Sequence, residues 1–423
     1  MRVIVAGGGI GGLATALSLH AEGIEVQVYD QVPVIRGIGA GINLQPNGVR
    51  ELVELGLGDA LARVGIETAR LNYYNKLGQL IWSEPRGLAA GYAWPQYSIG
   101  RGDLHVLLLE AVERRIGAER VHAGHRCVAF CQDASGVEVN FADAATGVVF
   151  PPVRADALIG ADGIRSVVRG LLHPEEGGTV HSGRIQWRGV VEAEPFLDGR
   201  THVTMGTRDV RAIVYPMSEP ARQRGRSLIN WIAVLGSQLA SGEQSWDRRA
   251  SKSRFFDQFR DWNFDWIPFA DLIQATEEVF EYPKDDRDPL SRWSFGRVTL
   301  LGDAAHPMRP VGSQAGSQAI VDARVLAWSL ATTQEAEAGL ALYEKQRLPA
   351  MNAVVLKNRE LGPSVVMDIV EQRAPGGFSD IDSVIPLRER EEIALSFKVA
   401  AGFDPATLNA RPSFSVNRRP AAA

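Results

Sequence analysis

The chain has 423 residues, more than one hydrophobic core usually organises, so two domains are expected. Apolar residues make up 45% of the chain and charged residues 22%, values that exclude general disorder. The formal net charge of −5 leaves no broad basic surface, which argues against nucleic acid as the main partner and against a polybasic membrane anchor. A small molecule is therefore the expected partner.

Cysteine and histidine usage argues against disulfides and metal sites. If GHRCVAFCQ is a strand, Cys127 and Cys131 lie on one face roughly 13 Å apart, too far for a disulfide. The eight histidines are scattered, and none joins Cys, Asp or Glu at ligand spacing, so no metal is predicted. No signal peptide precedes the strand that begins at Arg2, and no apolar run approaches the ~20 residues of a membrane span. We expect a soluble cytoplasmic protein with reduced thiols.

The first hundred residues predict a βαβ opening followed by a change of pattern. Residues 2–30 read as strand, tight turn, helix and strand, and a helix is expected at about 48–61. The run LNYYNKLGQLIWSEPRG then alternates like antiparallel strands, with a hairpin at Gly78. Helical spacing returns in LHVLLLEAVERRIG, and ADALIGADG restores the strand pattern of the opening.

The second half of the chain repeats this change of pattern. Between residues 181 and 282 the segments RIQWRGVVEA, HVTMGT, RAIVYPM and SLINWIAVL read as half-buried antiparallel strands, and SRFFDQFRDW reads as helical. A parallel-type strand follows at Val298, and the chain after about Arg359 is mostly helical.

These elements predict an α/β protein with a discontinuous parallel-sheet domain and an inserted antiparallel sheet. The Rossmann-like domain is expected at residues 1–70, 98–180 and 283–360. The inserted sheet is expected at 71–97 and 181–282, and a helical region with a tail at 361–423.

A glycine loop follows the first strand with the spacing GxGxxG at Gly7, Gly9 and Gly12. Glycine is needed where such a turn takes unusual φ, where backbone approaches a pyrophosphate and where helix packs on strand. Asp30 closes the second strand, where a carboxylate accepts hydrogen bonds from ribose hydroxyls. The loop therefore predicts a dinucleotide site and leaves FAD and NAD both open.

Two further strands end in an acid. In DALIGADGIRSVVR a strand ends at Asp162, Gly163 permits a sharp turn, and a short helix is expected to carry Arg165 and Arg169. In RVTLLGDAAHPMRPVGSQAGSQAIVDA a strand leads to Asp303, and a helix is expected from about Gly312. Each acid either binds a polyhydroxyl chain or merely caps the following helix.

Together these motifs resemble the FAD signatures of the flavoprotein aromatic hydroxylases, which have the p-hydroxybenzoate hydroxylase fold. The resemblance rests on GGGIGG with Asp30, on Arg101 in SIGRGDLHVLLLEA, on GADGIRSVVR and on LLGDAAHPMRPVGSQAGSQAIVDA, and spans about residues 1–360. Within that family the passages GAGINLQPN, LIWSEPRGLAAGYAWPQYSIGRG, QWRGV, SLINW and DRDPL are most similar to the 5-methylphenazine-1-carboxylate 1-monooxygenase group. Two departures stand out: Asp30 replaces the Glu of many members, and the chain beyond about residue 361 does not match.

The resemblance implies a role for each matching residue. The glycine loop would hold the pyrophosphate of FAD, Asp30 the adenosine ribose, Arg101 the pyrophosphate or ribityl region, and Asp303 the ribityl chain. Residues 40–42 would line the flavin, residues 162–163 would serve both FAD and the nicotinamide donor, and residues 313–316 would contact the pyrimidine edge of the flavin. The full implied set is Gly7, Gly9, Ile10, Gly11, Gly12, Asp30, Ala40, Gly41, Ile42, Arg101, Asp162, Gly163, Asp303, Ser313, Gln314, Ala315 and Gly316.

The resemblance also implies the chemistry. NAD(P)H would act as a transient reductant of bound FAD, and O₂ would then form a flavin C4a-hydroperoxide that hydroxylates an aromatic or N-heterocyclic small molecule. A flavin oxidase or dehydrogenase of an amine or alcohol remains the alternative, with a non-catalytic dinucleotide sensor as a third class. The assembly state stays open, with a homodimer as one option.

Substrate contacts are expected on the inserted sheet. Arg188 and Tyr215 would hold a carboxylate or phenol, and Trp187 or Trp231 would stack on a ring. The alternative is that aromatic residues on alternating strands pack in the core. His306 is expected to make local hydrogen bonds at its turn, and no catalytic base is assigned.

Overall fold

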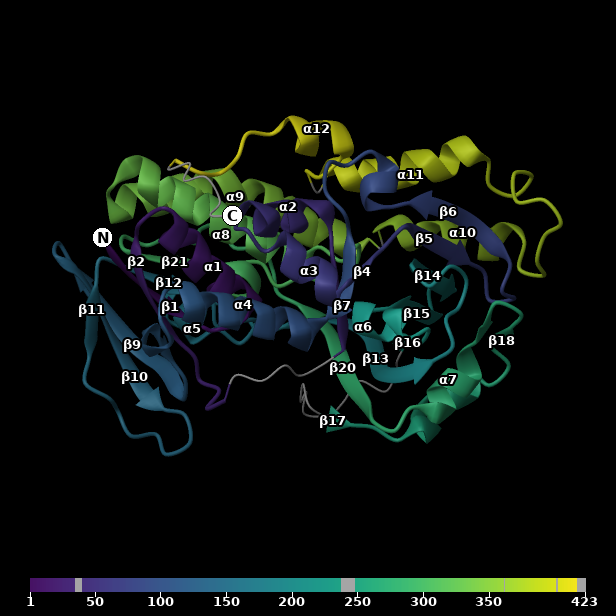
Figure 1. Cartoon of the computed structure of the whole chain (residues 1–423), viewed down its shortest axis with the longest axis horizontal. Coiled ribbons are helices and arrows are strands. Elements are labelled where there is room, and N and C mark those ends of the chain that lie inside the picture. Colours follow the sequence, from purple (N-terminus) through teal and green to yellow (C-terminus); the bar gives the residue numbers. More distant parts are fainter. Residues whose placement is uncertain (35–39, 237–247, 361, 401, 417–423) are drawn as a thin grey trace.

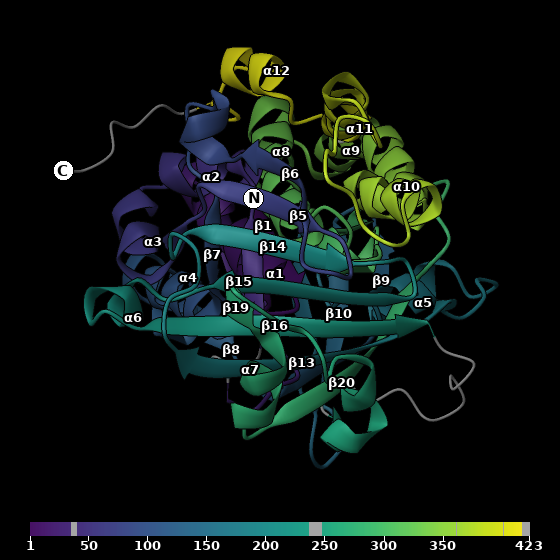
Figure 2. The ribbon, with the colours of Figure 1, turned by 90° about the vertical axis from the view of Figure 1, so that its right-hand side faces the viewer.

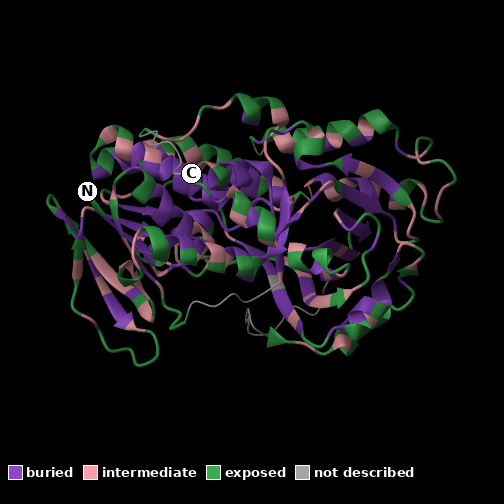
Figure 3. Cartoon of the chain, in the orientation of Figure 1, coloured by how far each residue is buried: buried purple, intermediate pink, exposed green. Residues whose placement is uncertain are grey.

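The computed structural model of the chain describes residues 1–34, 40–236, 248–360, 362–400 and 402–416. A parallel sheet and a larger mixed sheet lie side by side along the long axis of the molecule (Figure 1). Buried residues fill both sheets and the helices between them, and exposed residues gather on the outer helices and hairpins (Figure 3). The predicted two-part α/β architecture is confirmed.

The parallel sheet has five strands in the order β21-β12-β1-β2-β8, and every pairing within it is parallel. Its strands are short apolar runs because both faces are covered by helices. The strands are β1 (Arg2–Ala6), β2 (Glu25–Tyr29), β8 (Val121–His122), β12 (Ala157–Gly160) and β21 (Val298–Leu300). The covering helices are α1 (Ile10–Ala21), α4 (Arg101–Arg115), α5 (Val167–Leu172), α8 (Ala315–Thr333) and α9 (Ala336–Arg359).

The helix expected at 48–61 is two helices, α2 (Pro46–Glu54) and α3 (Gly58–Val64). Gly56 lies between them at φ +73°, a left-handed conformation that ends the first helix. The apolar spacing of Leu52, Leu55 and Leu57 continues across the break because all three side chains are buried in one core. A small sheet of β3 (Gly41–Leu44), β7 (Tyr97–Gly100) and β4 (Ile66–Glu67) adjoins these helices.

The two cysteines lie on opposite faces of β9 (His125–Asp133), which corrects the expectation that they share one face. Cys127 pairs with Phe141 and Cys131 with Glu138 on β10 (Gly136–Asp143), and a bulge between these pairs reverses the alternation. Cys127 is buried, Cys131 is exposed, and both are free thiols. The third strand of this sheet is β11 (Val153–Ala155).

The larger sheet has eight strands in the order β17-β20-β13-β16-β15-β14-β5-β6, and Figure 2 shows those from β20 to β6 stacked from bottom to top. Its pairings are antiparallel, as predicted, except that β5 and β14 run parallel where the two insertions join. The strands are β5 (Arg70–Tyr74), β6 (Leu80–Pro85), β13 (Val180–Ala193), β14 (Thr201–Gly206), β15 (Val210–Pro216), β16 (Ser227–Gly236), β17 (Arg248–Arg249) and β20 (Val279–Asp286).

The outer face of this sheet carries an aromatic core. Trp187, Trp231, Phe255 and Phe259 are buried there under α7 (Phe269–Ala275), which covers this face in Figure 2. The segment SRFFDQFRDW, expected as a helix, forms two 3-10 turns at Lys252–Arg254 and Phe256–Gln258. Its helix-like apolar spacing reflects burial of Phe255 and Phe259 in this core. The short strands β18 (Asn263–Phe264) and β19 (Ile267–Pro268) and the helix α6 (Glu219–Gln223) complete this part.

The predicted helical C-terminal region is confirmed as α10 (Val365–Arg373), α11 (Leu387–Ala400) and α12 (Pro405–Ala410). Helices α10 and α11 pack on β5 and β6 through a buried apolar cluster that includes Tyr73, Met367 and Ile385. The tail at 417–423 lies outside the described residues. Within the described ranges no helix has the length and apolarity to cross a membrane, and no group of three metal-ligating side chains is found.

Candidate functional site

The carboxyl ends of four parallel strands meet at one edge of the five-stranded sheet. The glycine loop follows β1, Asp30 follows β2, Asp162 follows β12, and Asp303 follows β21. Ligands of open α/β sheets bind at this edge, outside the carboxyl ends of the strands. The fold therefore brings together motifs that lie up to 300 residues apart in the chain.

The glycines of the loop differ in what a side chain would contact at each position. Gly7 has φ +115°, and a Cβ there would lie 2.2 Å from the carbonyl oxygen of Ala161. A Cβ on Gly12 would lie 1.8 Å from the carbonyl oxygen of Gly7, so both positions are fixed by backbone packing. Gly9 has an ordinary extended conformation, and a Cβ there would meet no atom of a described residue within 4 Å. Gly9 thus leaves open space at the start of α1, where the first backbone N–H groups have no acceptor within the helix.

Asp30 supports the glycine loop directly. Its carboxylate accepts hydrogen bonds from the Gly8 N–H at 2.6 Å and from the Val32 N–H at 2.7 Å. The carbonyl of Gly8 contacts the His105 ring at 2.6 Å, which ties the loop to α4. Asp30 is half-buried, and its two carboxylate oxygens can each accept a further hydrogen bond.

Asp162 caps the helix that follows it. Its carboxylate accepts hydrogen bonds from the Val167 N–H at 2.7 Å and from the Ser166 hydroxyl, and burial raises its pKa. Gly163 takes φ +80°, which confirms the predicted sharp turn. The capping role left open by the sequence is therefore present, and a role of Asp162 in cofactor binding stays a prediction. Helix α5 begins at Val167, so Arg165 precedes the helix instead of lying on it.

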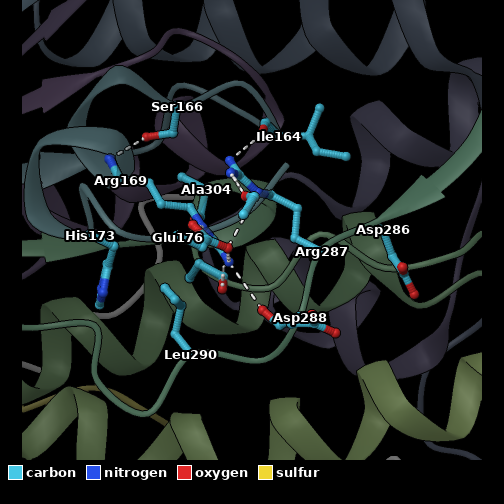
Figure 4. A network of polar contacts seen from close by, with 12 residues as sticks. Ile164, Ser166, Arg169, His173, Glu176, Asp286, Arg287, Asp288, Leu290 and Ala304 are labelled. Atoms are coloured by element: carbon cyan, nitrogen blue, oxygen red, sulfur yellow. Dashed lines mark hydrogen bonds and ion pairs between the residues drawn. The ribbon is translucent and has the colours of Figure 1, made fainter. Parts of the chain in front are cut away.

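Arg169 is fully buried and holds the Asp162 and Asp303 segments together (Figure 4). Its guanidinium donates to the carbonyls of Ala304 and Ala305, both at 3.0 Å, and to the Asp288 carbonyl at 3.1 Å. Its Nε and Nη2 also bind the carboxylate of Glu176, the former at 2.7 Å. This cation has a partner on every side, so its function is to fix the turn that carries Asp303.

Asp303 accepts no hydrogen bond from any described residue. It caps no helix, because α8 begins only at Ala315, which corrects the expected start near Gly312. Its side chain is open to solvent, yet the surrounding protein desolvates it and raises its pKa, against the opposing charges of His306 and Arg101. A carboxyl group that is desolvated and still accessible lies in the wall of a recess.

The turn before α8 is built from two residues in the left-handed region, Gly312 at φ +66° and Ser313 at φ +54°. A Cβ on Gly312 would lie 2.3 Å from the ring of Phe397, so the C-terminal helix α11 packs directly on this turn. Gln314 is buried and accepts a hydrogen bond from Gln318 at 3.0 Å. The first N–H groups of α8, at Ala315 and Gly316, have no acceptor within the helix.

Residues 40–42 connect this turn to the inner face of the eight-stranded sheet. Ile42 lies against Gly316, where an added Cβ would be 2.7 Å from the Ile42 side chain. The Gly41 N–H donates to the Asn230 side chain at 2.8 Å, and a Cβ on Gly41 would lie 2.5 Å from the Tyr215 ring. The carbonyl of Ala40 accepts a hydrogen bond from the Arg101 N–H at 3.2 Å.

Arg188 and Tyr215 lie on this inner face together with Asn230. Arg188 pairs across the strands with Ile232, which pairs in turn with Ile213. Tyr215 and Asn230 form the next pair on the same face, two residues further along their strands. The Arg188 guanidinium lies over the Tyr282 ring at 5.4 Å, and its Nε has no hydrogen-bond partner. Burial raises the pKa of Tyr215 and lowers that of Arg188.

Trp187 and Trp231 point to the opposite face, which excludes the predicted stacking on a substrate ring. Their indole N–H groups donate to Glu281 at 2.9 Å and to Thr276 at 2.8 Å, inside the aromatic core. The core-packing alternative is confirmed for both. Consecutive residues of a strand lie on opposite faces, so Trp187 and Arg188 cannot both meet the same site.

His306 makes local contacts, as expected. Its ring hydrogen-bonds Asp322, which also accepts from Arg347 at 2.6 Å and from the Gly302 N–H at 3.3 Å. Burial alone would raise the pKa of Asp322, but Arg347 and His306 hold it below its usual value. This buried network supports the backbone just before Asp303.

These residues fit a flavin dinucleotide extending from the glycine loop to the inner sheet face. The open space at Gly9, the unpartnered Asp303 and the free N–H groups of α8 line one edge of the parallel sheet. Asn230, which sequence reasoning missed, joins residues 40–42 to the inserted sheet. The sequence signal that could have indicated it is a single Asn within the apolar strand SLINWIAVL, which the structure buries fully.

Comparison with known proteins agrees with this geometry. The model of a family described as FAD binding domain matches residues 1–358. A phenazine 1,6-dicarboxylic acid hydroxylase from Lysobacter antibioticus is 44% identical over 85% of this chain and 89% of its own length. A 3-hydroxybenzoate 6-hydroxylase from Polaromonas naphthalenivorans is 30% identical over 86% and 87%. The crystal structure of HpxO from Klebsiella pneumoniae with FAD and uric acid superposes with a TM-score of 0.75 at 28% identity, covering 97% of each chain.

Proposed function

The chain belongs to the FAD-binding-domain family of flavoprotein aromatic hydroxylases, and from this premise we propose that it hydroxylates a polycyclic N-heteroaromatic acid of the phenazine-carboxylate type. It is a single-component monooxygenase that uses FAD, NAD(P)H and O₂, as its relatives act on aromatic and heterocyclic substrates. The substrate itself is the part that we propose.

The observation that carries the proposal is the contact between residues 40–42 and the inner sheet face. Gly41 is hydrogen-bonded to Asn230 and packed on Tyr215, so a ring lying over the flavin would also lie against that face. Arg188 is on the same face and forms no salt bridge with a residue that the structure describes. A guanidinium in this state suits a carboxylate on the substrate.

The bound FAD supplies the activated oxygen, and the protein binds, orients and excludes water. Asp303 and Arg101 would hold the ribityl and pyrophosphate region. The N–H groups at the start of α8 would stabilise negative charge on the flavin pyrimidine edge. Burial raises the pKa of Tyr215 further above neutrality, so its protonated hydroxyl would donate a hydrogen bond to the substrate.

The domain division follows from the same arrangement. We propose that residues 1–70, 98–180 and 287–360 form the cofactor domain and that the inserted sheet covers the substrate. Strand β20 crosses the boundary expected at 282/283, and its pairing with β13 extends to Asp286. Helices α10 and α11 would close the remaining side, since they pack on both the inserted sheet and the Gly312 turn.

A substrate screen tests the proposal. Purified holoenzyme is mixed with NADPH or NADH and with phenazine-1-carboxylate, phenazine-1,6-dicarboxylate, 3-hydroxybenzoate or urate. We expect the phenazine acids to stimulate NAD(P)H oxidation most and to gain one oxygen atom by mass spectrometry. Conversion of an amine or alcohol without oxygen incorporation would instead support the oxidase alternative.

A further inference from the structure

Four cations on the inner face of the eight-stranded sheet form no salt bridge with an acid among the described residues. Arg184 and Arg188 lie on β13, Arg211 on β15 and Lys284 on β20. None of them forms a salt bridge, although 32 such pairs occur elsewhere in the described chain. We call these four residues the cationic face.

Strand register places all four on one side of the sheet. Arg184 and Arg188 alternate with Ile185 and Trp187, whose side chains fill the outer aromatic core. Tyr282, Gln186, Val234 and Arg211 form one row across four strands, and Lys284 follows Tyr282 by two residues on β20. Long side chains from these strands therefore converge on the same side.

Lys284 and Arg211 are both buried, and neither forms a salt bridge with a described residue. Lys284 is 7% exposed and donates no hydrogen bond to a described residue. Arg211 is 6% exposed, donates only to the Thr207 carbonyl at 3.3 Å, and leaves Nη2 unpartnered. Burying unpaired charge is costly, so such groups are retained where a ligand completes them.

The acids next to Lys284 in the chain form ion pairs with other residues. Asp286 is bound to Arg359 at 2.8 Å and to Arg309 at 3.4 Å, and Asp285 is bound to His181. Asp368 on α10 is half-buried and faces Arg211, Arg208 and Arg184. Burial, followed by the charges of Arg211, Arg184, Arg188 and Arg309, lowers the pKa of Lys284 to about 7.

We propose that Lys284, Arg211 and Arg184 form a buried subsite for a second carboxylate of the aromatic substrate, so that this chain selects a dicarboxylate. The inference rests on the proposed function for the ring that lies beside Tyr215. Arg211 lies four residues from Tyr215 along β15, roughly 13 Å away. A substrate that reaches both residues must therefore contain more than one ring. Arg188 lies between them and would take the first carboxylate.

Equilibrium binding to the FAD-loaded protein tests the subsite without turnover. Phenazine-1,6-dicarboxylate and phenazine-1-carboxylate are titrated by calorimetry into wild type, Lys284→Met, Lys284→Arg and the control Lys345→Met, an exposed lysine on α9. We expect Lys284→Met to weaken dicarboxylate binding about tenfold to hundredfold and to leave the monocarboxylate within about twofold. Lys284→Arg and Lys345→Met should bind both acids like wild type.

Proton uptake gives a second readout. A bound carboxylate raises the pKa of Lys284, so dicarboxylate binding at pH 8 should take up protons, measured in two buffers of different ionisation enthalpy. Uptake should be small at pH 5.5, where Lys284 is already protonated, and absent in Lys284→Met. Equal proton uptake in wild type and Lys284→Met would overturn the assignment.

Other outcomes separate the subsite from the proposed function. The subsite is overturned if Lys284→Met loses the same affinity for both acids. It is also overturned if the wild-type protein binds neither acid. Oxygen transfer to an uncharged heterocycle would still leave the hydroxylase function in place. A selective loss of NADPH over NADH in Lys284→Met would assign the cations to the phosphate of the reductant and also overturn the subsite.

Discussion

Arg169 and Lys284 are both buried cations, and the fold treats them in opposite ways. Arg169 donates to three carbonyls and to Glu176, and its position ties two strand ends together (Figure 4). Lys284 lies among the cations Arg211, Arg184 and Arg188 and forms no salt bridge with a described residue. A buried charge with hydrogen-bond partners stabilises the fold, whereas a buried charge without them lowers stability until it loses its proton or a ligand pairs with it.

The same contrast separates the strand-end acids. The Asp162 carboxylate is occupied by the N–H groups of α5, and Asp303 accepts no hydrogen bond from the described residues. Both have a raised pKa because both are desolvated. Hydrogen bonding within the protein, and not burial, therefore distinguishes Asp162 from Asp303.

The largest effect is expected for Arg169→Met. Removing the guanidinium leaves three carbonyls without this donor and takes from Glu176 its closest cation, although Arg287 remains at 3.4 Å, so the free energy of unfolding should fall by about 3–5 kcal/mol. Urea unfolding of the purified protein measures this loss. Arg222→Ala, which breaks an exposed ion pair with Glu219, is the control and should cost less than about 1 kcal/mol. Similar losses of unfolding free energy in Arg169→Met and Arg222→Ala would show that the buried network of Arg169 contributes no more stability than an exposed ion pair.

Lys284→Met should instead stabilise the ligand-free protein by a few kcal/mol at pH 7, since it removes a buried charge without a partner. The folded-state pKa of about 7 lies below the usual lysine value of 10.5. Between these pH values the unfolded chain binds more protons, so wild-type stability rises with pH. The advantage of the variant should therefore shrink from pH 7 to pH 10 in urea melts. A constant or growing advantage would contradict the charge argument.

The two acids should respond oppositely to substitution. Asp303→Ala is expected to lower FAD affinity roughly tenfold to hundredfold, because a ribityl contact is lost, while the apoprotein keeps its unfolding midpoint. Asp162→Ala should cost about 1–2 kcal/mol of stability through loss of a helix cap. Flavin absorbance after gel filtration and urea melts of the apoproteins report the two quantities. Wild-type flavin content in Asp303→Ala would contradict the assignment.

The grouping of motifs at the carboxyl ends of the parallel strands could be predicted from the sequence, because each motif directly follows its own strand. Parallel strands bring their carboxyl ends to one edge, so the glycine loop, Asp30 and Asp303 were placed together before any contact was known. The acid cap at Asp162 and the hairpin at Gly78 follow the same local rules.

The inner sheet face was less predictable because long-range pairing creates it. Lys284 stands beside Asp285 and Asp286, a pattern that resembles exposed ion pairs, and pairing of β20 with β13 buries it instead. The bulge that separates Cys127 from Cys131 leaves no periodic signal. Which face of an alternating strand meets a site depends on the other domain, and no single strand carries that information.

Gly9→Val gives the smallest and most selective test of the contrast between structural and ligand-facing positions. The Val side chain enters open space at the start of α1, so the fold should tolerate it, whereas an approaching pyrophosphate would be displaced. We expect FAD affinity to fall about tenfold with little change in apoprotein stability. Gly12→Ala is the matched control, because its Cβ would lie 1.8 Å from the Gly7 carbonyl oxygen and should destabilise the apoprotein itself. If Gly9→Val destabilised the apoprotein as much as Gly12→Ala, both glycines would be architectural. The open space at Gly9 would then have no bearing on the cofactor.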